Sequence, residues 1–402
     1  MNQLEAILQS WIEDPPKKHA LVEMQCDASQ LLDAIKNVDM FPKMYWKGRH
    51  QESIQIGLGM VESWKNLPNQ TQKKLSKNQI IFHIDAFDAN QPQWNGYPTQ
   101  LTFRPKMTIV FNSKTQIVSV CFDNRPNIHH NDEHPEFTKQ PHCPNKSEWI
   151  EGIVYSKKLF EQSALEKIVL ARQSHLTCSQ PWKIFELLIE GQPNCYHFLY
   201  APNAKSCFMG ASPERLFQLK MQELQTEAIA GTRRNHPEET FDLSNNPKDQ
   251  KEHQFVVDFI QSQLQPLCDD ISIKEQQILH LQHVQHLYTP ICATIQPAVH
   301  INQILKVLHP TPAVCGFPQA LARQYIHQIE NFHRGWYAGT MGCITSENVD
   351  FTVLIRSALC VDGQVIVWTG AGIVQDSIPE NEWDELNNKA TQFRKITNQL
   401  QS

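Results

Sequence analysis

Short runs of β-branched and aromatic residues recur along this chain of 402 residues, separated by polar and turn-forming segments. Such runs are typical of β-strands, whereas other segments carry apolar residues at helical spacing. The strand candidates are 54–59, 79–85, 101–103, 107–111, 116–120, 167–172, parts of 196–230, 338–345, 350–360 and 364–369. The helix candidates begin at about 147 and also cover 247–265, 299–308, 317–330 and 380–399. The mixture predicts a strand-rich α+β fold.

The charge of the chain excludes several classes of protein. Lys and Arg total 36 against 42 Asp and Glu, which gives a net charge of −6 without a basic stripe. Such a chain is a poor candidate for binding nucleic acid or an anionic membrane. No apolar stretch approaches the roughly 18 residues of a membrane span, and the first residues lack the pattern of a signal peptide. We therefore expect no nucleic acid and no membrane as partner.

The 11 cysteines do not form a recognisable disulfide or metal-binding framework. They are scattered singly, with no CxxC pair, and an odd number in a long chain favours reduced thiols. We therefore expect a cytoplasmic protein. The proline-rich segment 124–144 contains several histidines without a ligand pattern, and we interpret it as a solvated loop rather than a metal site.

Two pairs of carboxylates stand at helical spacing. Asp249 and Glu252 lie near the start of one predicted helix, and Glu382 and Glu385 lie near the start of the last one, with Lys389 one turn further on. Residues three apart share one face of a helix, so two such pairs could hold Mg²⁺ through hard oxygen ligands. Spacing alone leaves an alternative open, because acidic residues in a first turn also complement the helix dipole.

One lysine and one glutamate are candidates for acid–base chemistry. Lys167 opens the apolar run that continues to Ala171, and strand alternation can point its ammonium group inward, where a desolvated lysine acts as a general base. The alternative is a lysine at a strand end that reaches water. Glu214 follows Ser212-Pro213 at a turn, and it is either a buried acid or an ordinary turn carboxylate.

Two turns that contain glycine end apolar strands, at Gly231 and at Gly370 to Gly372. Glycine allows backbone N–H groups to approach an anionic ligand closely. The second turn lacks the third glycine and the following helix of a dinucleotide fingerprint. Together with the carboxylates, these features indicate an enzyme that binds a metal and an anion.

The ordered motifs of this chain resemble those of the chorismate-utilising enzymes of menaquinone, siderophore and tryptophan biosynthesis, and among them the isochorismate synthases. The resemblance covers about residues 145–395. The motifs are Glu166-Lys167-Ile-Val-Leu-Ala-Arg172, Gly210-Ala-Ser-Pro-Glu214-Arg-Leu, Ala230-Gly231-Thr-Arg-Arg234, Lys248-Asp249-x-x-Glu252-His253, Leu308-His-Pro-Thr-Pro-Ala313, Gly316-Phe-Pro, Arg334-Gly-Trp-Tyr-Ala-Gly339, Ile355-Arg356-Ser-Ala, Thr369-Gly-Ala-Gly372-Ile-Val and Glu382-Trp-x-Glu385-x-x-x-Lys389.

The resemblance implies a fold, a cofactor and a substrate. Length alone allows two or three domains of about 150 residues each. The resemblance instead implies one chorismate-binding domain over 1–402, with a divergent strand-rich part at 1–145 and a motif-bearing catalytic part at 146–400. Two β-layers would stack face to face with helices outside. The cofactor would be Mg²⁺ and the substrate chorismate, and we expect a monomer.

The resemblance also implies a role for each site residue. Lys167 matches the base that activates water for attack at C2 of the ring, and Glu214 matches the acid that protonates the departing C4 hydroxyl. Glu252 and Glu385 match the Mg²⁺ ligands, with Asp249 and Glu382 holding the water shell of the ion. Positions that line the substrate site match Gly231, His286, Ala313, Tyr337, Arg356, Gly370 and Lys389.

Two residues and the length indicate which member of the family the chain resembles. Relatives that use ammonia lack the lysine, so Lys167 argues against anthranilate and aminodeoxychorismate synthesis. Salicylate-forming relatives carry Thr where this chain has Ala313, so we expect the reaction to stop at isochorismate. The length and the compact N-terminal region favour a siderophore-type synthase. The alternatives are a salicylate synthase, a menaquinone-pathway isochorismate synthase and an inactive chorismate-binding protein.

Overall fold

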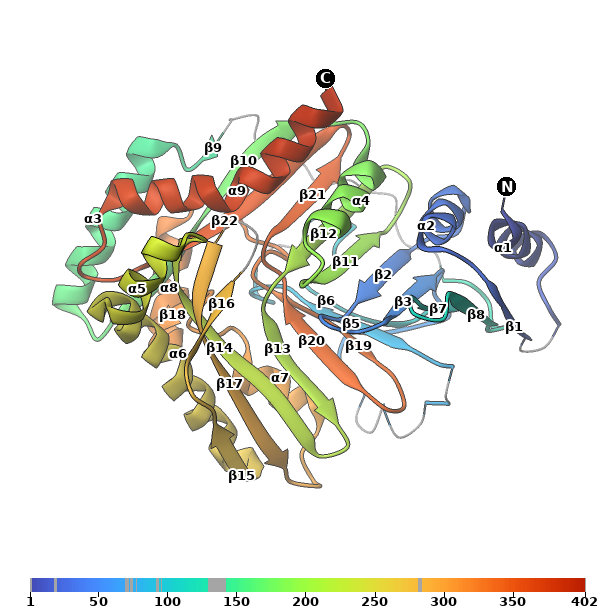
Figure 1. Ribbon diagram of the computed structural model, residues 1–402, viewed down its shortest axis with the longest axis horizontal. Helices are drawn as coiled ribbons and strands as arrows, with labels where there is room; N and C mark the ends of the chain where they lie inside the picture. The colour runs from blue at the N-terminus through green and yellow to red at the C-terminus, as the bar shows by residue number, and fades with distance from the viewer. Residues whose placement is uncertain are drawn as a thin grey trace.

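Two antiparallel β-sheets, stacked face to face, form the centre of the computed structural model (Figure 1). The structure describes residues 2–17, 20–68, 72, 75–76, 78–91, 94, 96–128, 142–280 and 284–401. Most of the loop predicted at 124–144 lies outside the described residues. The α+β fold with two stacked β-layers, predicted from the sequence, is confirmed.

The first sheet has 12 strands in the described part of the chain, and it draws on both the N-terminal third and the remainder. In spatial order its path is β1 (Ala20–Gln25), β8 (Ile117–Phe122), β7 (Met107–Asn112), β3 (Ser53–Leu58), β2 (Lys43–Lys47), β11 (Tyr196–Ala201), β12 (Ser206–Ser212), β21 (Ser357–Val361), β22 (Gln364–Ile373), β10 (Lys167–Thr177) and β18 (Gly316–Phe317). The short β9 (His142–Cys143) pairs with β10 off this path.

The second sheet has 10 strands among the described residues, and the N-terminal third contributes to it as well. Its path is β15 (Cys268–Ile273), β17 (Val284–Ile295), β14 (Glu223–Arg234), β13 (Arg215–Lys220), β20 (Val349–Val353), β19 (Thr340–Ile344), β5 (Ile81–Asp85), β6 (Gln100–Arg104) and β4 (Glu62–Trp64). β16 (Gln277–His280) pairs with β17.

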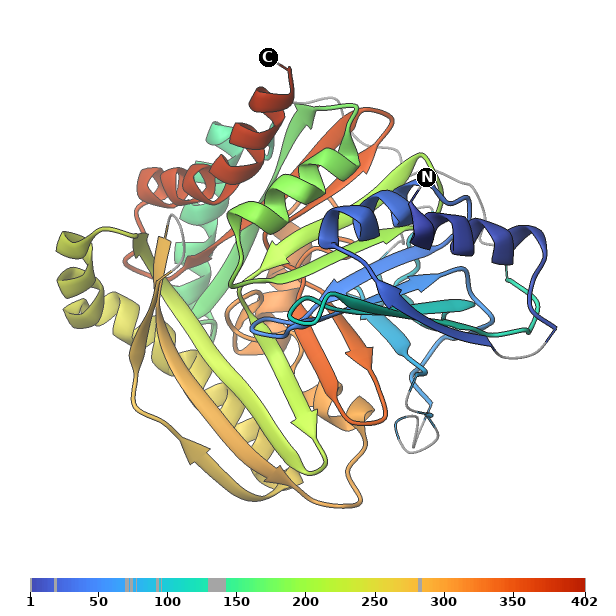
Figure 2. The ribbon, with the colours of Figure 1, turned by 45° about the vertical axis from the view of Figure 1, so that its right-hand side comes forward.

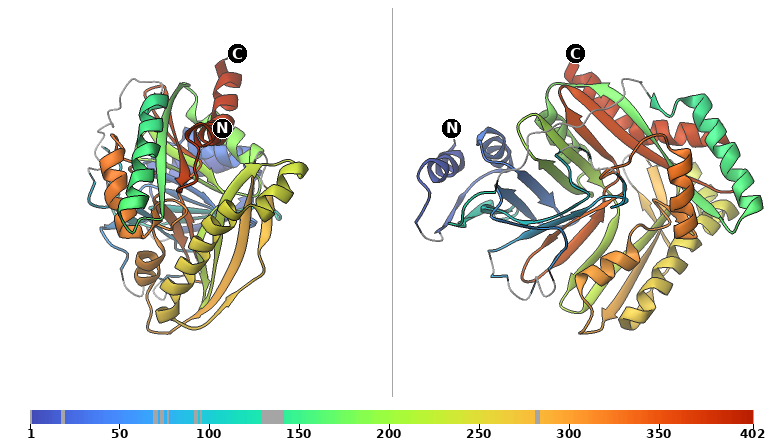
Figure 3. Two further views of the ribbon diagram at one scale, coloured as in Figure 1. Left: turned by 90° about the vertical axis from the view of Figure 1, so that its left-hand side faces the viewer. Right: turned by 180° about the vertical axis from the view of Figure 1, so that it is seen from behind.

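Helices cover the outside of the two sheets (Figures 1 and 2). They are α1 (Gln3–Glu13), α2 (Ala28–Asn37), α3 (Lys146–Gln162), α4 (Pro181–Gly191), α5 (Pro237–Asn245), α6 (Pro247–Leu264), α7 (Ile301–Leu308), α8 (Gln319–Ile329) and α9 (Pro379–Gln401). A 3₁₀ turn, η2 (Gln265–Leu267), follows α6. Helix α6 lies against β14, and α9 lies against β22 and α3. Seen from behind, α7 and α8 lie beside α6 (Figure 3).

Side-chain alternation explains why the first sheet is apolar on both faces. Met44 and Trp46 of β2 point into the core between the sheets, whereas Tyr45 points into a second core beneath α1, α2 and α4. A strand with both faces buried reads as a continuous apolar run. β2 itself was not among the strands predicted from the sequence. Among the described residues, no helix is long and apolar enough to span a bilayer.

One predicted strand and several helices need correction. The run 350–360, expected to be one strand, is two strands in different sheets, because Arg356 between them adopts a left-handed backbone with φ of 51°. Helices α1, α2, α4 and α5 were not predicted. The start of α2 carried a readable signal, since Asp27 and Gln30 form a capping box there.

The chain passes directly from one sheet to the other at two places that matter for the site. β12 of the first sheet ends at Ser212 and β13 of the second begins at Arg215, so Glu214 lies in the crossing. β20 of the second sheet is followed by β21 of the first, with Arg356 in the crossing. Both crossings therefore carry a residue that the sequence predicted to be functional.

Candidate active site

A pocket lies where the two sheets meet the N-terminal turns of α6 and α9. It is lined by Val169, Pro213, Glu214, Ile229, Ala230, Gly231, Thr232, Arg233, Lys248, Asp249, Glu252, His286, Ala313, Val314, Tyr337, Ile355, Arg356, Trp368, Thr369, Gly370, Gly372, Glu382, Glu385 and Lys389. Every predicted site residue except Lys167 is in this list. Elements far apart in the sequence thus place their functional side chains around one cavity.

Lys167 lies just behind the pocket wall and points inward. Its side chain is fully buried, and Nζ is 2.9 Å from Oε1 of Glu252 on α6. The inward orientation expected from strand alternation is therefore confirmed. A glycine in the neighbouring strand leaves room for this ion pair, because a Cβ on Gly372 would come within 2.5 Å of the same Glu252 oxygen.

Glu214 is a buried acid at the crossing from β12 to β13, with 6% of its surface exposed. Its backbone N–H is held by the Ser212 hydroxyl and its carbonyl accepts from the Thr352 hydroxyl. From the residues that the structure describes, the carboxyl group receives a single long hydrogen bond of 3.5 Å, from Thr311. Burial, together with the negative charge of Glu227, raises the pKa of Glu214 to about 8. A protonated acid at neutral pH can donate a proton.

Each of the four carboxylates of α6 and α9 that line the pocket is paired with a cation of the chain. In addition to the pair of Glu252 with Lys167, three pairs close around the pocket. They are Asp249 with Arg233 at 2.5 Å, Glu382 with Lys248 at 2.8 Å and Glu385 with Lys389 at 2.6 Å. The pair on α9 is an i, i+4 pair, but it is mostly buried rather than a surface pair.

The environment moves the pKa values of these carboxyl groups in different directions. Burial raises the pKa of Asp249 to about 6, against the lowering effect of Arg233. Burial and the charge of Glu385 raise the pKa of Glu382. For Glu252, burial is outweighed by the cations around it, above all Lys167, and its pKa falls below the usual value. Glu252 is therefore the most firmly ionised of these three groups.

The donor atoms suit a hard divalent cation, although they are not gathered around a metal position. In the part of the chain that the structure describes, no three His, Cys, Asp or Glu side chains are close enough to hold an ion. The carboxylates face protein cations instead. Carboxylate oxygens from two helices are nevertheless the ligand type that Mg²⁺ takes, and α6 and α9 bring them to one cavity. The residues fit Mg²⁺ once the ion pairs open.

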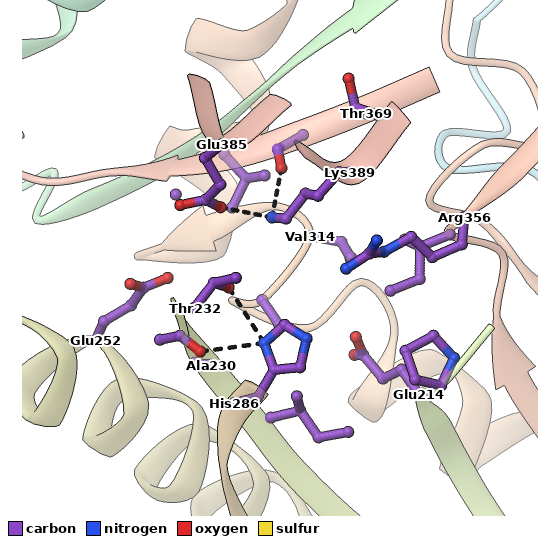
Figure 4. Close-up of a pocket in the computed structure, with 18 of the residues that line it drawn as sticks. Glu214, Ala230, Thr232, Glu252, His286, Val314, Arg356, Thr369, Glu385 and Lys389 are labelled. Atoms are coloured by element: carbon purple, nitrogen blue, oxygen red, sulfur yellow. Dashed lines mark hydrogen bonds and ion pairs between the residues drawn. The ribbon is translucent and has the colours of Figure 1, made fainter. Parts of the chain in front are cut away.

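The opposite side of the pocket is suited to an anion. Figure 4 shows Arg356 and Lys389 above His286, with Glu252 and Glu214 on either side of it. Lys389 donates to the Gly370 carbonyl at 2.8 Å, and His286 Nδ1 lies 3.1 Å from the Gly231 carbonyl. Burial and the nearby cations lower the pKa of His286 to about 3, so this ring is neutral. Its hydrogen bond to the carbonyl fixes the proton on Nδ1 and leaves Nε2 as an acceptor.

Two glycine positions are explained by close approach or by backbone shape. Gly370 leaves room for Tyr337, whose hydroxyl would lie 2.7 Å from a Cβ there. Gly231 interrupts the register of β14 against β17 and has φ of 69°, in the left-handed region. The glycine turns singled out in the sequence therefore do shape the pocket.

Sequence reasoning missed the two cations Arg233 and Lys248, which hold Asp249 and Glu382. Both stand inside motifs that were recognised: Arg233 follows two residues after Gly231, and Lys248 stands directly before Asp249. The motifs did not reveal these ion pairs, because a motif does not show which acidic side chain a basic side chain will contact. The pairing depends on where β14, α6 and α9 come together.

Comparisons with known proteins agree with this geometry. The family model described as chorismate binding enzyme matches residues 106–398. The chain is 31% identical to isochorismate synthase MenF of Escherichia coli over 92% of this chain and 91% of that protein. It is 36% identical to the salicylate biosynthesis isochorismate synthase of Pseudomonas aeruginosa over 62% of this chain and 54% of that protein. The solved structure of MenF, the menaquinone-specific isochorismate synthase from Escherichia coli, superimposes with a TM-score of 0.80, 27% identity and 98% coverage of both chains.

Proposed function

The chain belongs to the family of chorismate-binding enzymes and, within it, to the isochorismate synthases, and from this premise we propose that it is the isomerase that converts chorismate into isochorismate. The observation that carries the proposal is that a buried lysine and a buried glutamate lie on different sides of one pocket. Lys167 is fully buried beside Glu252, and burial raises the pKa of Glu214 to about 8.

The reaction adds water at C2 of the ring and expels the C4 hydroxyl as water, while the ring double bonds shift. Lys167 accepts a proton from the attacking water, and Glu214 donates one to the leaving hydroxyl. Lysine accepts a proton only as the free amine, so the ion pair of Lys167 with Glu252 must open before the chemical step. The hydrogen-bonded backbone of Glu214 keeps the donor in place during that step.

Glu252 and Glu385 would hold Mg²⁺ directly, and Asp249 and Glu382 would hold its water shell. The bound ion would neutralise and orient the ring carboxylate of chorismate. The second carboxylate of chorismate is on the enolpyruvyl group. It would be bound by Arg356, Tyr337 and the backbone at Gly370. The neutral His286 adds an acceptor rather than a charge, so Arg356 and Lys389 supply the positive field.

We propose the menaquinone branch rather than the siderophore branch favoured by the chain length. The similarity to MenF extends over more than nine-tenths of this chain and of that protein. The similarity to the salicylate biosynthesis enzyme stops at 62% of this chain. Deleting the gene in its host should remove menaquinone and leave catechol siderophores unchanged. Loss of the siderophore with menaquinone intact would contradict this assignment.

The activity is tested by incubating the full chain with chorismate and Mg²⁺ and separating the products by chromatography. We expect isochorismate without pyruvate. Release of pyruvate in the absence of an added lyase would instead identify a salicylate synthase, and no turnover at all would identify a binding protein. Lys167→Ala should abolish turnover while chorismate still binds, as measured by calorimetry. Substantial residual turnover would exclude Lys167 as the base.

A further inference from the structure

An arginine at the tip of a hairpin in the N-terminal third is buried. Arg49 lies in the turn between β2 and β3, yet only 5% of it is exposed. Hairpin turns usually lie at the surface, and an arginine is rarely buried unless it is paired. The partners of Arg49 lie on β14 and at the crossing that carries Glu214.

Arg49 and Glu227 form a buried ion pair that holds the peptide groups on both sides of Glu214. Nη1 of Arg49 donates to the carbonyl of Pro213 at 2.5 Å, and Nη2 donates to Oε2 of Glu227. The other oxygen of Glu227 accepts the backbone N–H of Arg215 at 2.9 Å. The residue before the glutamate and the residue after it are therefore fixed by the two members of one ion pair.

A second set of contacts anchors the same hairpin. Gln51 donates to Asp350 at 2.6 Å, and Tyr196 donates to the other oxygen of that carboxylate at 2.9 Å. The side chain of Arg215 donates to the Tyr196 hydroxyl at 2.8 Å. These hydrogen bonds fix the β2–β3 hairpin against both sheets beside the crossing from β12 to β13. They hold Arg49 in one orientation.

We propose that Arg49 is a positioning residue for Glu214, through which the N-terminal third of the chain completes the catalytic apparatus. The inference rests on the proposed role of Glu214 as the acid. Among the described residues, the Glu214 carboxyl group receives one long hydrogen bond. The orientation of this group therefore depends on the position of the Glu214 backbone. Misplacing a reacting group by about 1 Å can lower a rate by roughly 10²-fold.

The ion pair also sets the charge around Glu214. The charged or titratable groups that interact with this glutamate come from separate elements: Glu227 from β14, Lys167 from β10, Lys389 from α9 and Tyr337 from the loop before β19. Arg49 of the β2–β3 hairpin and Arg215 of β13 contact Glu227 and the residues on either side of Glu214. Removing Arg49 leaves the negative charge of Glu227 uncompensated. Removing the charge of Glu227 leaves the positive charge of Arg49.

The test compares Arg49→Gln with Glu227→Gln in the full-length enzyme, using the pH dependence of kcat/KM. Both variants break the same ion pair, but they change the local charge in opposite directions. We expect the alkaline limb to move to higher pH in Arg49→Gln and to lower pH in Glu227→Gln, each by roughly one pH unit. We also expect kcat to fall about tenfold or more with KM little changed, because no substrate contact is removed.

Arg49→Lys separates geometry from charge. A lysine keeps the positive charge but lacks the fork that reaches two partners at once. The alkaline limb should stay in place while kcat falls about tenfold. The matched control is Arg125→Gln, which removes another arginine of the N-terminal third from ion pairs with Glu62 and Asp123 away from the pocket. It should leave both kcat and the pH profile unchanged.

The proposal would be overturned if the alkaline limb of the pH profile stayed in place in Arg49→Gln and Glu227→Gln, or moved in the same direction in both. If either of those variants does not fold, normal kcat in Arg49→Lys would overturn it as well. Failure of the proposed function looks different, because the wild type would then make no isochorismate or Glu214→Gln would remain active.

Discussion

At the scale of single residues, the site is a set of ion pairs rather than a set of free groups. Asp249, Glu252, Glu382 and Glu385 each hold one cation of the chain. A buried charge without a partner is costly, so each ion pair offsets part of the cost of placing a carboxylate in a poorly solvated pocket. Glu214 forms no ion pair with any residue that the structure describes, and burial raises its pKa to about 8, compared with about 6 for Asp249.

The pH dependence of the reaction should report Glu214. An acid with a pKa of about 8 carries its proton below that pH and loses it above, so the donor form disappears as pH rises. We expect kcat/KM to fall on the alkaline side with a midpoint near pH 8. Unfolding is excluded as the cause if the melting temperature is the same at pH 7 and pH 9. A flat profile through this range would contradict the assignment of Glu214 as the acid.

The close contact at Gly372 should make this position intolerant of any side chain. In Gly372→Ala the new Cβ would come within 2.5 Å of Glu252 Oε1, so the pair with Lys167 must shift. We expect at least about a tenfold loss of kcat. Gly363→Ala is the control, because its Cβ meets nothing within 4 Å, although its φ of 76° makes alanine strained. The control should lose stability and keep its activity, and equal losses in both variants would contradict this explanation.

At the scale of elements, the site depends on where strands end and helices begin. Two crossings between the sheets deliver Glu214 and Arg356, and two helix starts deliver the four carboxylates. The N-terminal turns of α6 and α9 meet at the pocket because α9 rests on β22 and on α3, and α6 rests on β14. A change that loosens one of these supports acts on the site indirectly.

The start of α3 offers a test of stability that is separate from activity. Asn145 accepts the backbone N–H groups of Ser147 and Glu148, and Glu148 returns a hydrogen bond to the Asn145 N–H. Asn145→Ala should therefore lower the free energy of unfolding by about 1 kcal/mol, measured by denaturant titration. Asn145→Asp keeps the cap and should be close to wild type. Because α3 does not line the pocket, kcat should be unchanged in both.

At the scale of the whole molecule, the N-terminal third is part of the same structure as the motif-bearing remainder. Strands β2 and β3 of the first sheet and β5 and β6 of the second come from it. Its β2–β3 hairpin reaches Pro213 beside Glu214. The part of the chain with the fewest recognisable motifs therefore contacts the segment that carries Glu214.

Binding of Mg²⁺ should stabilise the whole molecule, because it would tie α6 to α9. A ligand that binds only the folded state adds about 2.7 kcal/mol at a hundredfold excess over Kd. We expect the melting temperature of the wild type to rise with Mg²⁺ and fall back with EDTA. Glu252→Gln and Glu385→Gln should lose this response. Glu380→Gln, on the exposed first turn of α9, should keep it, and an absent response in the wild type would contradict the metal site.

The sequence by itself determined the α+β class, most strands and the helices that carry the carboxylates, whereas the inward orientation of Lys167 was left open until the structure showed it buried. The features that the sequence determined follow from local periodicity and from ordered motifs, both of which can be recognised within short segments of the sequence. It did not determine that 350–360 divides between two sheets, that Asp249 meets Arg233, or that Arg49 lies beside Glu214. Only the tertiary structure decided these points, because a backbone crossing and the partner of a buried charge depend on packing between segments far apart in sequence.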